Sequence, residues 1–236
     1  MQISIIIPAF NEEKYIAPCL ESILTSAPDA LLEIIVVDNA SNDHTAEIAH
    51  QFPRVRIVRE EKKGLTKARQ AGFIAAQGDL LAYLDADCRI PSFWFSCILS
   101  SFERDPSLVC VSGPYRYENV SLTVRWFTFL YWWIAFVMSK LVGYMAVGGN
   151  FVAKKESLIA IGGFDTSIDF YGEDTNIARR LSAQGKVRFD RSLFVWTSAR
   201  RFEKEGFFKT GIIYILNFLS EVFLKRPVTK TSSDIR

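Results

Sequence analysis

The feature that most constrains the fold is the alternation, through the first 84 residues, of short apolar runs with segments of helical period. Runs rich in β-branched residues, without polar alternation, predict strands buried on both faces, as in a parallel sheet covered by helices. We expect strands at residues 3–7, 32–37, 55–59 and 80–84, and helices at residues 12–26, 43–51 and 65–77. Asn11 and Ser41 stand where they can cap the first two helices. The pattern predicts an α/β fold.

The second half of the chain is less regular. We expect helices at residues 91–104, 122–144, 173–184 and 205–224, and strands at residues 108–112, 150–154, 187–189 and 194–197. We interpret residues 1–202, including the aromatic helix at about 122–144, as one domain, residues 203–226 as an apolar membrane-associating helix, and residues 227–236 as a polar tail.

Net charge, cysteine spacing and the N-terminal sequence indicate which binding partners and which cellular compartment to expect. A net charge of only +2 gives no support for nucleic-acid binding. The four cysteines, Cys19, Cys88, Cys97 and Cys110, lack metal-finger spacing, so we expect buried thiols in a reducing compartment. The apolar start is too short and lacks the basic residues of a signal peptide, which predicts a cytoplasmic location.

Polar side chains follow three of the predicted strands. Asn11 follows the first strand, Asp38 and Asn39 the second, and Asp85 and Asp87 the fourth. Because ligands bind outside the carboxyl ends of the strands in an open parallel sheet, we expect these residues to share one site.

Asp85 and Asp87 are two residues apart at a strand end, where both can approach one divalent cation. Oxygen ligands of this kind suit Mg²⁺ or Mn²⁺, which also engage substrate phosphates. A solvated acidic turn is the alternative interpretation of the pair.

A set of short motifs, in order along the chain, resembles the family 2 glycosyltransferases. They are residues 8–13 (PAFNEE), 36–41 (VVDNAS), 64–72 (GLTKARQAG), 85–87 (DAD), 148–151 (GGNF), 162–165 (GGFD) and 172–174 (GED). Each motif alone is weak, whereas the ordered set, which spans about residues 3–202, is specific. The resemblance implies the GT-A fold with its mixed, mainly parallel sheet, a nucleotide-sugar donor, a divalent cation and inversion at the anomeric carbon.

The resemblance also implies roles for individual residues. Pro8, Ala9 and Glu12 match positions that wrap the nucleoside, and Asp38 matches a carboxylate that binds the base. Asn39 stands where many relatives carry a second Asp. The remaining residues expected to bind the donor are Arg69, Asp85, Gly149, Asn150 and Arg201.

Asp174 is the candidate catalytic base, with Glu173 beside it at a helix start. A direct displacement needs the acceptor hydroxyl to be deprotonated as it attacks, and a positioned carboxylate does this. An ordinary acidic first helical turn is the alternative.

Residues 198–202 (SARRF) fall where processive family members carry Gln-x-x-Arg-Trp, and only Arg201 matches. Loss of the Trp argues against a long-chain polymerase. Arg200 or Arg201 can still clamp a diphosphate, since guanidinium suits phosphate oxygens. A solvated basic face is the alternative.

Two apolar segments indicate contact with a membrane. Residues 126–138 are aromatic and lie between Arg125 and Lys140, which leaves fewer than the roughly 20 apolar residues of a membrane span. In the last helix, Thr210, Tyr214, Asn217 and Glu221 form one narrow polar stripe. We expect association with the cytoplasmic face of a membrane, peripheral or monotopic; a homodimer that buries these surfaces is the alternative.

The leading hypothesis is an inverting transferase that uses a UDP- or GDP-sugar, Mn²⁺ or Mg²⁺, and a lipid, lipid-linked or saccharide acceptor. A nucleotidyltransferase would share the sheet and metal but would not need Asp174. A non-catalytic module that binds nucleotide sugars at a membrane is the third hypothesis.

Overall fold

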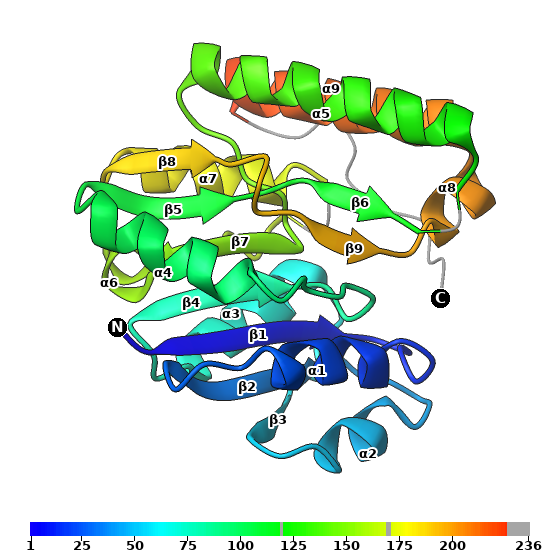
Figure 1. The fold of residues 1–236 in the computed structure, drawn as a ribbon, viewed down its shortest axis with the longest axis vertical. Helices are drawn as coiled ribbons and strands as arrows, with labels where there is room; N and C mark the ends of the chain where they lie inside the picture. The colour runs from blue at the N-terminus through cyan, green and yellow to red at the C-terminus, as the bar shows by residue number, and fades with distance from the viewer. Residues whose placement is uncertain (119, 169–170, 226–236) are drawn as a thin grey trace.

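A seven-stranded mixed sheet forms the centre of the molecule. The computed structural model describes residues 1–118, 120–168 and 171–225 (Figure 1). The strands of the large sheet are β1 Ile3–Ala9, β2 Leu31–Asp38, β3 Val55–Arg59, β4 Leu80–Leu84, β5 Leu108–Ser112, β7 Asn150–Lys154 and β8 Lys186–Phe189. They are ordered β3-β2-β1-β4-β7-β5-β8, and a small parallel sheet pairs β6 Tyr115–Tyr117 with β9 Val195–Thr197.

The first four strands are parallel, as their continuous apolar sequences predict. β7 runs antiparallel to both β4 and β5, while β8 is again parallel to β5. The mixed, mainly parallel α/β sheet is therefore confirmed. Because β1, β2 and β4 share one direction, their carboxyl ends meet at the same edge.

Helices cover both faces of the sheet. They are α1 Ile16–Thr25, α2 Thr45–His50, α3 Leu65–Ala75, α4 Trp94–Arg104, α5 Leu122–Val142, α6 Lys155–Ala160, α7 Glu173–Ser182, α8 Arg200–Glu205 and α9 Phe207–Leu224. One buried cluster joins α1, α2 and α4 to the sheet, and a second joins α3, α6 and α7 to the opposite face. Along β1 the side chains alternate between these cores, Ile5 and Ile7 in the first and Ile6 in the second.

The expected caps of the first two helices are wrong. α1 begins at Ile16 and α2 at Thr45, behind Tyr15 and His44. Asn11 instead has φ of 53°, and its Oδ1 accepts a hydrogen bond from the backbone N–H of Asn42. The Ser41 hydroxyl accepts one from the backbone N–H of Asn11, so the two side chains tie the β1 and β2 loops together.

The helix expected at 205–224 begins two residues later, at Phe207, and a short helix that the sequence did not predict, α8, precedes it. α8 ends at Glu205, and Gly206 has φ of 86°, a left-handed conformation that glycine adopts without strain. α9 then runs from Phe207 to Leu224. The polar tail expected at residues 227–236 lies outside the described residues.

α5 and α9 lie side by side along one end of the molecule, next to β8 (Figure 1). Trp132 stacks on Phe189 of β8 with ring centroids 5.9 Å apart, and Phe218 of α9 packs on the same cluster. The polar stripe of α9 faces inward: Thr210, Asn217 and Glu221 are all buried.

Candidate functional site

The carboxyl ends of β1 and β4 and the start of α7 open on one cavity of about 500 Å³. Nine of the predicted site residues line it, namely Pro8, Glu12, Arg69, Asp85, Asp87, Gly149, Glu173, Asp174 and Arg201. The two candidate metal ligands and the candidate base therefore share a cleft, although 87 residues separate Asp87 from Asp174 in the sequence.

Asp85 and Asp87 form an oxygen pair suited to a divalent cation. A carboxylate oxygen of each, together with the Cys88 thiol, lies within 4.8 Å of the others. Burial raises the pKa of Cys88 well above the ordinary value, so the thiol stays protonated and points its sulfur to the carbonyl oxygen of Gly149, 3.7 Å away. The two carboxylates thus fit Mg²⁺ or Mn²⁺ better than a thiolate-binding metal.

Arg69 joins Asp85 to Glu173, the residue before the candidate base. We call Asp85 and Asp87, the two candidate metal ligands, the metal-type pair. The Arg69 side chain is only 1% exposed, with Nη2 3.2 Å from Asp85 Oδ1 and Nη1 2.5 Å from Glu173 Oε1. Arg69 lies in the second turn of α3, whereas Glu173 begins α7. A cation held between two acids fixes the distance between the two halves of the site.

The Gly148-Gly149 pair passes directly against these charged groups. A Cβ atom on Gly148 would lie 2.5 Å from Glu173 Oε1 and 2.9 Å from Arg69 Nη1, and one on Gly149 would overlap the Asp85 carboxylate. The hydroxyl of Tyr115 donates to Asp85 Oδ2 at 2.9 Å and accepts the Gly149 N–H at 2.8 Å. The glycines therefore allow close backbone approach to the site's own side chains.

The candidate base lies at the start of α7. Gly172, with φ of 81°, precedes Glu173 and Asp174, and Asp174 Oδ1 accepts the backbone N–H of Thr175 at 2.7 Å. Burial raises the pKa of Asp174, and this hydrogen bond opposes the rise. Burial also raises the pKa of Glu173 to about 8, against the opposing charge of Arg69. Burial, more than a neighbouring carboxylate, makes Asp174 a stronger base than a free Asp.

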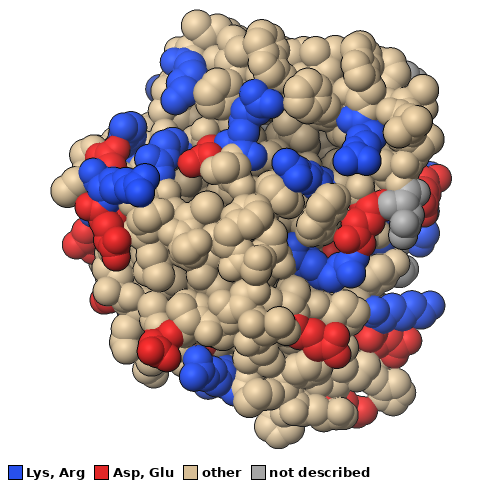
Figure 2. Space-filling model, in the orientation of Figure 1, with Lys and Arg blue, Asp and Glu red and all other residues tan. Residues whose placement is uncertain are grey.

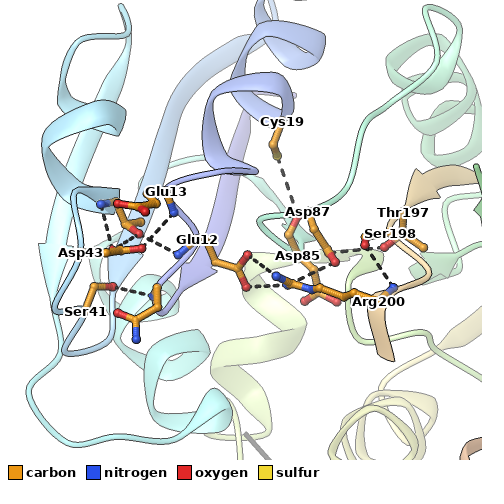
Figure 3. A network of polar contacts seen from close by, with 12 residues as sticks. Glu12, Glu13, Cys19, Ser41, Asp43, Asp85, Asp87, Thr197, Ser198 and Arg200 are labelled. Atoms are coloured by element: carbon orange, nitrogen blue, oxygen red, sulfur yellow. Dashed lines mark hydrogen bonds and ion pairs between the residues drawn. The ribbon is translucent and has the colours of Figure 1, made fainter. Parts of the chain in front are cut away.

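Arg200 lies between Glu12 and Asp87 (Figure 3). Its two terminal nitrogens are 2.6 and 2.8 Å from the two Glu12 oxygens, and Nη2 is also 3.2 Å from Asp87 Oδ2. Thr197 donates to Asp87 Oδ1 at 3.3 Å. Both arginines considered for a diphosphate clamp line the cavity. Arg200 contacts Asp87, whereas Arg201 pairs with Glu205 at 3.4 Å.

Four predicted donor-binding residues lie outside the cavity lining: Ala9, Asp38, Asn39 and Asn150. Ala9 and Asp38 are paired across β1 and β2, and Asp38 Oδ1 accepts the Ser41 N–H.

The side chains of Asn39 and Asn150 are hydrogen-bonded within the protein. Asn39 Nδ2 donates to the carbonyls of Glu60 and Lys62, and its Oδ1 accepts the Gly64 N–H, which closes the loop before α3. Asn150 is fully buried between Trp94 Nε1 and the Leu193 carbonyl.

Tyr115 and Thr197 are site residues that the sequence did not single out. Both stand on the small β6–β9 sheet, which brings them to Asp85 and Asp87. The strand expected at 194–197 is β9, whereas β6 was not predicted, because its three residues carry too little periodicity.

Comparisons with known proteins agree with this geometry. The family model described as Glycosyl transferase family 2 matches residues 4–162. Glycosyltransferase AglE of Haloferax volcanii is 37% identical over 98 residues, covering 39% of this chain and 32% of that protein. Putative glycosyltransferase EpsH of Bacillus subtilis is 29% identical over 126 residues, covering 52% of this chain and 36% of that protein. The chain spans about a third of the length of these two relatives.

Solved structures share the fold. Mannosyltransferase PcManGT from Pyrobaculum calidifontis, in complex with GDP-Man and Mn²⁺, superposes with a TM-score of 0.74 at 22% identity, over 95% of this chain and 63% of that one. S. aureus TarS 1–349 in complex with UDP-GlcNAc superposes with a TM-score of 0.65 at 17% identity, over 84% of this chain and 58% of that one. Likeness at these identities shows the GT-A-like fold.

Proposed function

The chain belongs to glycosyl transferase family 2, and we propose that it moves a sugar, with inversion, from a nucleoside-diphosphate sugar to a hydroxyl of a lipid, lipid-linked or saccharide acceptor. The observation that carries the proposal is the single cavity lined by Asp85, Asp87 and Asp174. A metal-type pair and a separate carboxylate of raised pKa supply the two groups that direct displacement requires.

For the donor we propose a UDP- or GDP-sugar whose diphosphate lies against Asp85 and Asp87. The solved relatives bind GDP-Man with Mn²⁺ and UDP-GlcNAc, which supports this class of donor. Mn²⁺ or Mg²⁺ held by the two carboxylates would stabilise the charge that builds on the departing diphosphate.

For the acceptor step we propose Asp174 as the base. The acceptor oxygen attacks the anomeric carbon on the face opposite the diphosphate, and its proton passes to the Asp174 carboxylate. The new C–O bond forms as the bond between the anomeric carbon and the diphosphate oxygen breaks, and the electron pair leaves with the nucleoside diphosphate. Arg69 holds Glu173 beside Asp174, so that the start of α7 keeps its position relative to Asp85.

Donor turnover tests this function. We expect a panel of UDP- and GDP-sugars, incubated with Mn²⁺ and a membrane lipid extract, to yield free nucleoside diphosphate and new glycolipids detected by mass spectrometry. Release of pyrophosphate would instead indicate a nucleotidyltransferase, and release of neither would indicate a binding module.

Two variants test the roles of the acids. Asp174→Asn should retain donor binding and lose transfer, whereas Asp87→Ala should weaken Mn²⁺-dependent donor binding. Asp29→Ala, an exposed acid outside the cavity, serves as the control. Normal turnover by Asp174→Asn would refute the base assignment.

We also propose that α5 and α9 attach the protein to the cytoplasmic face of a membrane. Of the described helices, α5 has the length and apolar composition of a membrane span. The outward faces are apolar while the polar residues point inward: Trp126, Phe129 and Leu216 are at least half exposed, whereas Thr210 and Glu221 are fully buried. This arrangement is the reverse of a water-facing helix and suits hydrocarbon.

Basic side chains border this apolar end. Figure 2 shows few charges at the top of the view and Lys and Arg in a band beneath it. Arg191 lies 5.6 Å from the Phe129 ring and Lys140 lies 5.3 Å from the Phe136 ring, so both cations sit beside α5. Cations at this level favour anionic headgroups, which supports a helix pair lying in the interface.

Vesicle flotation tests the attachment. We expect binding to vesicles that contain phosphatidylglycerol and weaker binding to pure phosphatidylcholine. Leu216→Asp on α9 should weaken binding, whereas Ile74→Asp, on an even more exposed apolar residue of α3, should not. A dimer that Leu216→Asp dissociates, without vesicle binding by either form, would instead support the homodimer.

A further inference from the structure

The catalytic cavity does not end at the candidate base but continues between the two apolar helices. Beyond Asp174, its walls come from α5 and α9. The lining residues on these helices include Tyr131, Trp132, Ala135, Met138, Phe218 and Leu219. We call this extension, between those six side chains, the slot.

Among the described residues few polar groups line the slot: Thr128 and Asn217 are hydrogen-bonded within their own helices, while the buried Nε1 of Trp132 has no hydrogen-bond partner. The Thr128 hydroxyl donates to the carbonyl oxygens of Val124 and Arg125, and Asn217 Nδ2 donates to the Ile213 carbonyl. The remaining wall is aromatic and aliphatic, with Met138 as a side chain that adapts to irregular shapes. An apolar passage of this kind suits a hydrocarbon chain better than a sugar or a peptide, which need hydrogen-bonding partners.

The slot meets the site at Asp174. Tyr131 and Asp174 line the same cavity, and both burial and the charge of Asp174 raise the pKa of the Tyr131 phenol. Tyr214 packs on Tyr171 with ring centroids 5.8 Å apart at the same junction. A chain in the slot therefore delivers its polar end to Asp174.

We infer that the slot holds the hydrocarbon chain of the acceptor lipid and that this lipid presents a hydroxyl, rather than a phosphate, to Asp174. The inference rests on the proposed function and specifies its acceptor. It draws on the continuity of the slot with the catalytic cavity and on its position between helices whose outer faces are apolar.

The acids at the junction favour the hydroxyl. A lipid phosphate is already anionic, so it needs no base to attack the anomeric carbon. It would also approach the Asp174 carboxylate with like charge, at a cost that is large where burial limits screening. A hydroxyl, such as that of a lipid-linked sugar, carries no charge and has a proton for Asp174 to accept.

Photolabelling tests the occupant directly. The probe is a long-chain alcohol with a diazirine near the chain end, incorporated into nanodiscs with the full chain and no donor. We expect mass spectrometry to find labels on slot residues such as Met138 and Phe218, and excess unlabelled alcohol to remove them. The matching alkyl phosphate should compete at least tenfold less well.

Slot-filling variants provide the controls. Ala135→Trp from α5 and Leu219→Trp from α9 should each reduce the slot label at least fivefold, while Leu141→Trp, on an exposed residue outside the cavity, should not. Labels confined to outward residues such as Trp126, or slot labels unaffected by both variants, would overturn the inference. Equal competition by the alkyl phosphate would overturn its hydroxyl part.

Failure of the proposed function would appear in a different measurement. Nucleoside diphosphate release by slow donor hydrolysis needs no acceptor, so the unaltered protein should show it even where no label appears in the slot. Loss of all release in the unaltered protein would refute the transferase itself, whatever the labels show.

Discussion

Arg69 Nη1 lies 2.5 Å from Glu173 Oε1, and both side chains are almost completely buried. The pair joins α3 to α7, the helix that carries Asp174. Arg69 also reaches Asp85 at 3.2 Å. The distance between the metal-type pair and the candidate base is thereby set by one guanidinium.

Arg69→Met should destabilise the fold above pH 8, where Glu173 is ionised, because it leaves that charge buried without its cation. Breaking a buried ion pair costs about 3–5 kcal/mol, and the low end applies here because Asp85 is partly exposed. Urea unfolding measures the loss. Arg56→Met, which breaks the Arg56–Glu33 pair whose arginine is 44% exposed, should cost about 1 kcal/mol. An equal loss in the two variants would contradict the structural role of Arg69.

The pH dependence of stability should report Glu173. Because burial raises its pKa from 4.5 to about 8, the folded protein keeps a proton that the unfolded chain has lost between these values. Stability should therefore fall as pH rises through this window, by up to about 1.4 kcal/mol per pH unit. In the Glu173→Gln variant the side chain has no such proton to lose. The unfolding free energy of this variant, relative to that of the unaltered protein, should therefore rise from pH 5 to pH 8.

Glu33→Gln is the matched control for this measurement. Glu33 is partly buried, but bonds from Arg56, Gln77 and Ser4 outweigh that burial and lower its pKa from 4.5. Glu33 is ionised in both the folded and the unfolded protein above pH 5. The difference in unfolding free energy between Glu33→Gln and the unaltered protein should therefore stay constant up to pH 8. A flat difference for Glu173→Gln as well would contradict the raised pKa of Glu173.

The sheet and its acidic edge were predictable because each rests on local sequence. Continuous apolar runs identify buried parallel strands, and parallel strands bring their ends together, which places Asp85 and Asp87 at the cavity. The contact between Arg69 and Glu173 joins residues 104 positions apart, and no spacing rule reaches that far.

Other details depended on which way a side chain turns. The motif match favoured Arg201, yet the adjacent Arg200 faces Glu12 and Asp87. Asn39 follows β2 as expected, but its amide closes the loop before α3. The polar stripe of α9 was visible in its periodicity, whereas its inward direction follows from tertiary packing.

Gly149→Ala should weaken metal-dependent donor binding. The new Cβ would overlap the Asp85 carboxylate and the Tyr115 hydroxyl, so Asp85 must move away from Asp87. We expect at least a tenfold weaker apparent affinity for Mn²⁺ in donor binding, measured by calorimetry, and about 1–3 kcal/mol of lost stability from overpacking. Gly143→Asn is the control, because a Cβ there meets nothing within 4 Å and Asn tolerates its left-handed backbone. Unchanged affinity in Gly149→Ala would show that Asp85 does not bind the metal.

Glu221 is fully buried on α9 and holds α7 in place. Its Oε1 accepts hydrogen bonds from Asn176 Nδ2 at 3.0 Å and from Arg179 Nη2 at 3.1 Å. Asn176 is two residues beyond Asp174 on the same helix. The apolar helix that we propose to contact the membrane is thus hydrogen-bonded to the helix that starts with the candidate base.

Glu221→Leu should therefore lower kcat while leaving donor affinity unchanged, because it removes contacts to α7 without touching the metal-type pair. Hydrogen bonds to a charged group contribute about 1.5–3 kcal/mol, and since Arg179 can still reach water we expect a loss of stability near the low end. Glu221→Gln keeps an acceptor for Asn176 and should restore part of kcat. Lys209→Ala, an exposed change on the same helix, should alter neither value. A stability loss in Glu221→Leu with normal kcat would mean that α9 supports α7 without positioning Asp174.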